Sequence, residues 1–153
     1  MLQQPIYSLF IRLIPETIIV MYAICLLTKS DVNLKNIIIS GIIGGICVYL
    51  TRMLPIHFGV HTILSIMLII VLAIRLNNIE THKAITASLT SVILLFISDM
   101  ILVVFYNTIN FTSALSGQTL VSVLAGVPSL VLFYFIVNII IYVKNMRVKN
   151  ELD

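Results

Sequence analysis

Six ionisable side chains stand out because each falls within or beside a long apolar run. They are Arg12, Glu16, Arg52, His57, His61 and Asp99. Charged residues make up only 10% of the 153 residues, whereas hydrophobic residues make up 60%. Arg12 and Glu16 are four positions apart, so a helix would place both side chains on one face. Asp99 is the only charged residue between positions 84 and 143. These residues are therefore the candidates for binding, ion pairing or proton transfer.

A carboxylate within a bilayer is unfavourable unless it is paired, protonated or hydrated, so Glu16 and Asp99 require partners. Three interpretations fit the residue types. The pairs Arg12–Glu16 and Arg52–Asp99 could fix the register of helices; the group could line a ligand pocket open to the outside; or it could form an ion or proton path.

His57 and His61 have the i, i+4 spacing that can hold a metal on a helix. No third ligand stands beside them in the sequence. We therefore predict no metal site, and we expect ordinary hydrogen bonding for both imidazoles.

No sequence motif indicates an enzyme. The chain has no nucleotide-binding loop, no HExxH and no nucleophile elbow. Cys47 lies among apolar residues, where a thiol is expected to be inert. The net charge of +3 is small and dispersed, which argues against nucleic-acid binding. The sequence predicts a non-enzymatic protein without a cofactor.

Long, continuously apolar runs predict the elements that must position these side chains. A membrane-spanning helix needs about 20 such residues, whereas a barrel strand would alternate polar and apolar positions. The first run is expected to stay in the mature protein, because it lacks a basic n-region and a cleavage site. We predict one all-α integral membrane domain over 1–153, a bundle of five helices at about 6–28, 36–54, 56–74, 84–106 and 119–143, followed by a basic tail at 144–153.

Lysines and arginines gather at alternate ends of these runs. The loops after the first and third runs and the tail carry Lys29, Lys35, Arg75, Lys83, Lys144, Arg147 and Lys149. The opposite ends carry only Arg52, apart from Arg12 within the first run. The positive-inside rule predicts an N-terminus outside the cell, a cytoplasmic C-terminus and a multi-pass location in the plasma membrane.

This orientation brings the ionisable residues to one level. The run 6–28 descends from the outside and the run 84–106 ascends toward it, so Glu16 and Asp99 both lie in the outer half. Arg52 and the two histidines flank a tight hairpin at the same face. We expect Pro55 to end the second helix and Gly59 to allow close backbone approach at the third.

Three glycines, Gly41, Gly44 and Gly45, fall on neighbouring turns of the second run. Small residues at such spacing let helix backbones approach closely in a membrane. We predict a packing surface here, either between helices of one chain or between copies in a homo-oligomer.

The stretches RLIPETIIVMYAICLL and RMLPIHFGVHT resemble small membrane proteins and N-terminal membrane domains of low-GC Gram-positive bacteria. In those proteins the region accompanies or precedes a histidine kinase. No phosphoacceptor or ATP-binding region follows the fifth run, so the resemblance implies a membrane input or accessory role.

The predicted function is binding of a ligand or a protein partner, such as a histidine kinase, as a sensor or accessory subunit in bacterial membrane signalling. The alternative is a small transporter, or a substrate-binding membrane component, that uses Glu16 and Asp99 to coordinate a cation or substrate.

Overall fold

The chain folds almost entirely into helices. The computed structural model describes residues 9–30, 33–53, 59–108 and 126–150, and no strand occurs within these ranges. The helices are a π-helical turn η1 (Leu9–Leu13), α1 (Ile14–Thr28), α2 (Leu34–Met53), α3 (Val60–Asn77), α4 (Thr81–Thr108) and α7 (Val127–Asn150). The prediction of an all-helical protein is confirmed for the described residues.

Four stretches are long and apolar enough to cross a membrane. They are Phe10–Thr28, Leu34–Met53, Val60–Asn77 and Thr81–Thr108. The apolar part of α7, Val127–Val143, is shorter. The expected start of the fifth segment, near residue 119, lies outside the described residues. The chain is therefore compatible with a multi-pass membrane protein.

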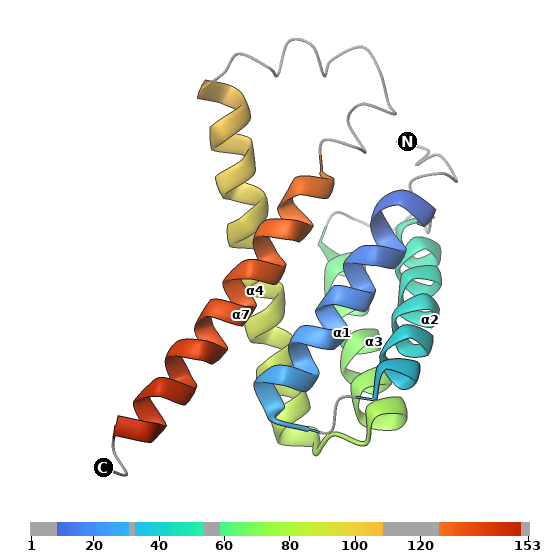
Figure 1. Cartoon of the computed structure of the whole chain (residues 1–153). Helices are drawn as coiled ribbons and strands as arrows, with labels where there is room; N and C mark the ends of the chain where they lie inside the picture. The colour runs from blue at the N-terminus through green and yellow to red at the C-terminus, as the bar shows by residue number, and fades with distance from the viewer. Residues whose placement is uncertain (1–8, 31–32, 54–58, 109–125, 151–153) are drawn as a thin grey trace.

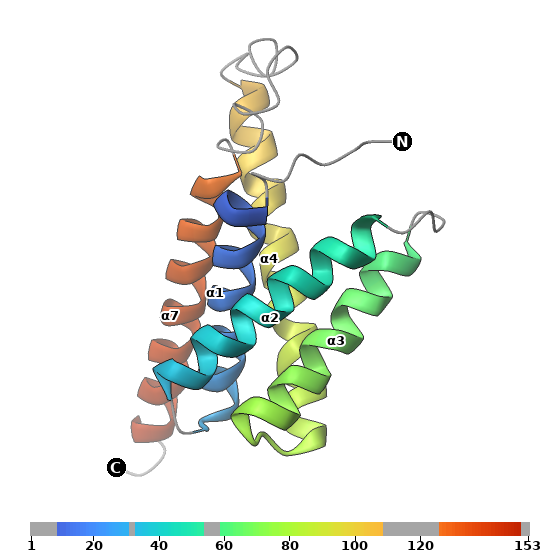
Figure 2. The same cartoon turned by 90° about the vertical axis from the view of Figure 1, so that its right-hand side faces the viewer.

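The helices run alternately up and down, and α1 packs against α2, α4 and α7 (Figures 1 and 2). The C-terminal ends of α1, α3 and α7 share one end of the bundle with the start of α4. We call this the basic end, because Lys29, Lys35, Arg75 and Lys83 lie there. The other end, where α2 stops and α3 begins, is the hairpin end. The predicted alternation of charge between the ends is therefore reproduced by the helix directions.

The helix boundaries differ from those predicted by hydropathy where polar residues extend a helix beyond its apolar part. α4 begins at Thr81 rather than near 84, and α7 continues to Asn150, through residues assigned to the tail. α3 continues to Asn77, after which Asn78 adopts a left-handed conformation (φ 51°) that ends the helix. Hydropathy identifies the apolar part of a helix but carries no information about such polar ends.

Gly59 precedes α3 with φ 108°, a conformation that other residues rarely adopt. Among the described residues, no atom beyond the adjacent residues lies within 4 Å of the position that a Cβ would occupy there. The close backbone approach expected at Gly59 is therefore not seen within the described ranges. Glycine is needed here because the chain must turn, and because a side chain would strain that turn. Pro55 lies outside the described residues.

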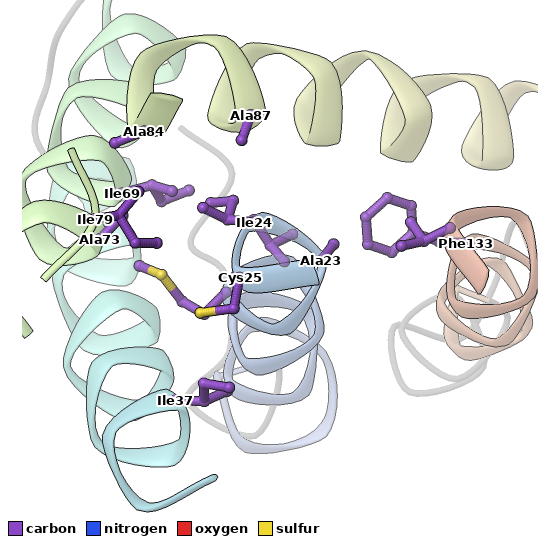
Figure 3. Close-up of a cluster of buried hydrophobic side chains, with 13 residues drawn as sticks. Ala23, Ile24, Cys25, Ile37, Ile69, Ala73, Ile79, Ala84, Ala87 and Phe133 are labelled. Carbon is purple, nitrogen blue, oxygen red and sulfur yellow. The ribbon is translucent and has the colours of Figure 1, made fainter. Parts of the chain in front are cut away.

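The apolar core surrounds the second half of α1 and lies nearer the basic end. Ala23, Ile24 and Cys25 of α1 face residues from every other α-helix (Figure 3). These neighbours are Ile37, Ile69, Ala73, Ala84, Ala87 and Phe133. Small alanines on α3 and α4 let those helices approach α1 closely, which holds the basic end of the bundle together.

Large apolar side chains cover much of the outer surface. Phe96, Met100 and Val104 of α4 are all more than half exposed. α4 also extends beyond the ends of α1, α2 and α3 in both views (Figures 1 and 2). Such a surface is unfavourable in water and favourable against lipid, as expected for membrane-spanning helices.

Candidate functional site: a charge cluster at the hairpin end

A π-helical turn places Arg12 at the centre of the candidate site. η1 contains Arg12 and leads directly into α1, whose second residue is Pro15. Proline has no N–H to donate to the preceding turn, so regular α-helix cannot continue upstream without adjustment. The wider π-helical turn provides that adjustment, and π-turns often occur at functional sites. Pro15 therefore determines the local geometry that presents Arg12.

Arg12 lies between two carboxylates from different helices. Its Nε is 3.6 Å from Oε2 of Glu16, one turn further along the same chain segment. Its Nη2 is 3.6 Å from Oδ2 of Asp99 on α4. Direct charge-assisted hydrogen bonds are shorter, at about 2.7–2.9 Å, so both ion pairs are loose enough to rearrange. The expected contact between Asp99 and an arginine is present, and Arg12 is the partner.

The cluster is partly open. The side chains of Arg12 and Asp99 are each 34% exposed, whereas that of Glu16 is 15% exposed. Glu16 therefore lies at the protected base of the cluster, and Asp99 lies nearer its opening.

A third helix contributes to the cluster through Gly126. A Cβ at this buried glycine would lie 2.7 Å from Nη1 and 2.8 Å from Cζ of Arg12. The guanidinium thus packs directly against the backbone where α7 begins. The sequence shows Gly126 only as a small residue in an apolar run, so its partner could not be inferred. The cluster joins α1, α4 and the start of α7.

Arg52 contributes at longer range. It lies in the last turn of α2, is exposed, and interacts electrostatically with Glu16. Among the described residues it forms no ion pair within 4.0 Å, so the predicted Arg52–Asp99 pair is replaced by Arg12–Asp99. The reason is geometric: Arg12 projects from the π-turn toward α4, whereas Arg52 lies at the exposed end of α2.

The structure describes one of the two histidines. His61 lies in the first turn of α3, where its carbonyl accepts a hydrogen bond from Ser65 Oγ at 2.7 Å. His57 lies outside the described residues. Within the described ranges no three His, Cys, Asp or Glu side chains gather as metal ligands.

The glycines of α2 lie against α1 directly below the cluster. Gly41, Gly44 and Gly45 are all buried. Cβ atoms at Gly41 and Gly45 would lie 2.7 Å and 3.1 Å from the Cα atoms of Ile18 and Ile14. The two backbones therefore approach too closely for larger residues, and the packing surface lies between helices of one chain.

Thr17 joins α1 to the glycine surface of α2. Its hydroxyl donates to the carbonyl of Gly41, at 2.6 Å, and also lies 2.9 Å from that of Leu13. This interhelical hydrogen bond holds α2 against α1. Thr17 was not among the residues predicted from the sequence, where the available signal was a polar residue within a long apolar run.

The three residues that meet directly, Arg12, Glu16 and Asp99, carry two potential negative charges and one positive charge. Such a group can exchange an internal ion pair for one with an incoming charged group, or it can fix three helices in register. No protein-family profile matches the chain, and no significant similarity to curated proteins or to solved structures was found.

Proposed function

We propose that the chain is a non-enzymatic, multi-pass protein of the plasma membrane that binds a ligand or partner at the Arg12–Glu16–Asp99 cluster. In this proposal it acts as a sensor or accessory subunit in bacterial membrane signalling. The observation that carries the proposal is the position of Arg12. It is partly exposed, paired with acids of α1 and α4, and in contact with the start of α7.

The proposal includes five membrane crossings. The apolar part of α7, Val127–Val143, spans about 26 Å at 1.5 Å per residue, slightly less than the hydrocarbon core of about 30 Å. The preceding sequence TLVSVLAG, 119–126, is mostly apolar and supplies the missing length. The distribution of cations then favours a cytoplasmic basic end.

Labelling with membrane-impermeant thiol reagents tests this topology. A cysteine at Ser113, which lies outside the described residues, should react from outside intact cells. A cysteine at Lys149 should react only after the membrane is opened. The background would carry C25A and C47A, so that only the introduced thiols react. Reaction of both sites from the same side would refute the five-crossing arrangement.

Signal transmission in this proposal uses α7. A charged group that competes for Arg12 would withdraw the guanidinium from Gly126 and change the packing of α7 at the hairpin end. α7 continues without interruption to its basic residues at the opposite end. A displacement of α7 at the cluster could therefore be transmitted along this one helix to a cytoplasmic partner such as a histidine kinase.

Chemical cross-linking in the cells that express the chain tests the signalling role. A tagged chain should be recovered with a membrane signalling protein in a fixed ratio, and D99N should reduce that recovery. E80Q is the matched control, because it neutralises an acid at the basic end. Equal recovery from D99N and E80Q would count against a role for the cluster.

Transport is the second candidate function. It is favoured because two carboxylates, Glu16 and Asp99, share one directly paired arginine, Arg12. Glu16 and Asp99 would then coordinate a cation or a cationic substrate. Reconstituted vesicles distinguish the two proposals. Cation or solute uptake that D99N abolishes and E80Q preserves would support transport and contradict a purely signalling role. The genes beside this one give a second test, because a kinase and regulator indicate signalling.

A further inference from the structure

A groove of about 670 Å³ lies at the basic end, between the end of α1 and the first three turns of α4. It is separate from the Arg12 cluster, which lies at the opposite end of the bundle. Lys29, His82 and Lys83 line it together with three threonines. The groove therefore combines cationic and hydroxyl groups at one end of an otherwise apolar structure.

The lysines supply positive charge that is only partly neutralised. Lys83 Nζ lies 3.0 Å from Oε2 of Glu80, and His82 Nε2 lies 3.7 Å from the same oxygen. An ammonium group has three N–H donors, so Lys83 keeps donors for another acceptor. Lys29 forms no ion pair with any residue that the structure describes. Among the residues that the structure describes, two lysines stand against one glutamate at the groove, which leaves an excess of positive charge.

Two helix ends border the groove. Lys29 ends α1 in a left-handed conformation, with φ 52°, which turns the chain there rather than continuing the helix. α4 begins on the opposite side of the groove, and its N-terminal N–H groups favour a negative charge. The C-terminal carbonyls of α1 favour a positive charge at the same groove, so the two helix ends offset each other and the lysine side chains carry the preference for an anion.

The threonines and apolar residues define the rest of the groove. Thr86 and Thr90 donate their hydroxyl protons to the carbonyls of His82 and Thr86, at 2.9 Å and 2.8 Å. Their oxygens can still accept hydrogen bonds from hydroxyl groups of a ligand. Leu27 and Ala87 line the groove as well, and they provide contact for an apolar chain. The matching ligand is anionic, hydroxylated and amphipathic.

We propose that this groove binds the phosphate headgroup of an anionic membrane phospholipid of the phosphatidylglycerol type, with Lys29 and Lys83 contacting the phosphate. Basic pockets between membrane helices at the cytoplasmic side suit such headgroups. The inference rests on the membrane location proposed above, but it requires neither the signalling role nor the orientation. The bound lipid would hold α1 and α4 together at the end opposite the Arg12 cluster.

Native mass spectrometry of the full chain released from lipid nanodiscs tests the proposal. Phosphatidylglycerol should remain bound, and phosphatidylcholine should not. Each of K29Q and K83Q should weaken retention about fivefold, which corresponds to about 1 kcal/mol per lysine. K35Q is the matched control, since Lys35 is exposed at the same end but does not line the groove. Both leaflets of a nanodisc carry the same lipid, so the result does not depend on orientation.

E80Q should change lipid retention in the opposite direction to K29Q and K83Q. A folding defect would lower retention, so it could not produce this result. Removing the Glu80 carboxylate frees Lys83 and should increase phosphatidylglycerol retention. Inorganic phosphate and glycerol 3-phosphate, added as competitors at the same concentration as the lipid, should not displace it. Displacement by either would identify a site for soluble anions and overturn the lipid proposal. Equal retention of both lipids, or unchanged retention in K29Q and K83Q, would overturn it too.

Discussion

Arg12 and Asp99 lie 87 positions apart in the chain, yet their side chains approach to 3.6 Å between Nη2 and Oδ2. This contact is a charged link between η1 and α4 toward the hairpin end. The same guanidinium also contacts Glu16 and Gly126. A substitution at Glu16, Asp99 or Gly126 should therefore shift the guanidinium and alter its contacts with the other two residues.

The Arg12–Asp99 pair should show energetic coupling. R12Q should lower the free energy of unfolding by about 1–3 kcal/mol, because it leaves two acids without their direct partner. The double variant R12Q/D99N should lose less than the sum of the two single variants. Unfolding in mixed micelles measures these energies. The exposed pair Lys83–Glu80 is the control and should show weaker coupling. Strictly additive effects at Arg12 and Asp99 would show that their pair contributes nothing.

G126A should act through Arg12. The new methyl group would occupy the space of the guanidinium and displace it from the acids, at a cost of about 1–2 kcal/mol. In an R12A background the space is empty, so the same substitution should be nearly neutral. Thermal unfolding of the four proteins measures this difference. An equal effect of G126A in both backgrounds would mean that the backbone of α7, rather than Arg12, requires glycine.

The glycines of α2 should differ in their tolerance of alanine. A Cβ at Gly41 would overlap the backbone of Ile18, so G41A should destabilise the bundle by about 1–3 kcal/mol. At Gly44 the nearest atom would be Leu72 Cδ1, at 3.4 Å, which is ordinary contact. G44A should therefore be close to neutral and is the matched control. Equal stability of the two variants would contradict the close approach of α1 and α2.

Glu80 should titrate below its usual range. The hydrogen bond from Lys83, and then the charge of Lys83, lower the pKa of this carboxyl. Because the pKa is lower in the folded than in the unfolded chain, the pair favours folding above the unfolded pKa. That contribution disappears as the pH falls through the folded value. A ¹³C NMR titration should show the pKa rising in K83Q more than in H82Q; an unchanged pKa in K83Q would exclude the contact in solution.

The sequence predicted the helices well because long apolar runs have few alternatives in a membrane. It also identified Arg12, Glu16 and Asp99 as related, since charges within such runs require partners. The choice between Arg12 and Arg52 as the partner of Asp99 depended on the direction in which the π-turn projects Arg12. The contact between Arg12 and Gly126 depended on where α7 begins relative to η1. The spacing of residues in the sequence predicts neither the direction of Arg12 nor the position of α7, because both follow from tertiary packing.

The unequal distribution of core and polar contacts has a mechanical consequence. Ala84 and Ala87 hold α4 against α1 near the basic end, whereas Arg12–Asp99 is a loose ion pair toward the other. α4 also packs against α7, and Ser98 and Leu102 in its second half are buried. Loss of the ion pair would therefore loosen α4 from the N-terminal segment near Arg12 while its base stays packed against α1.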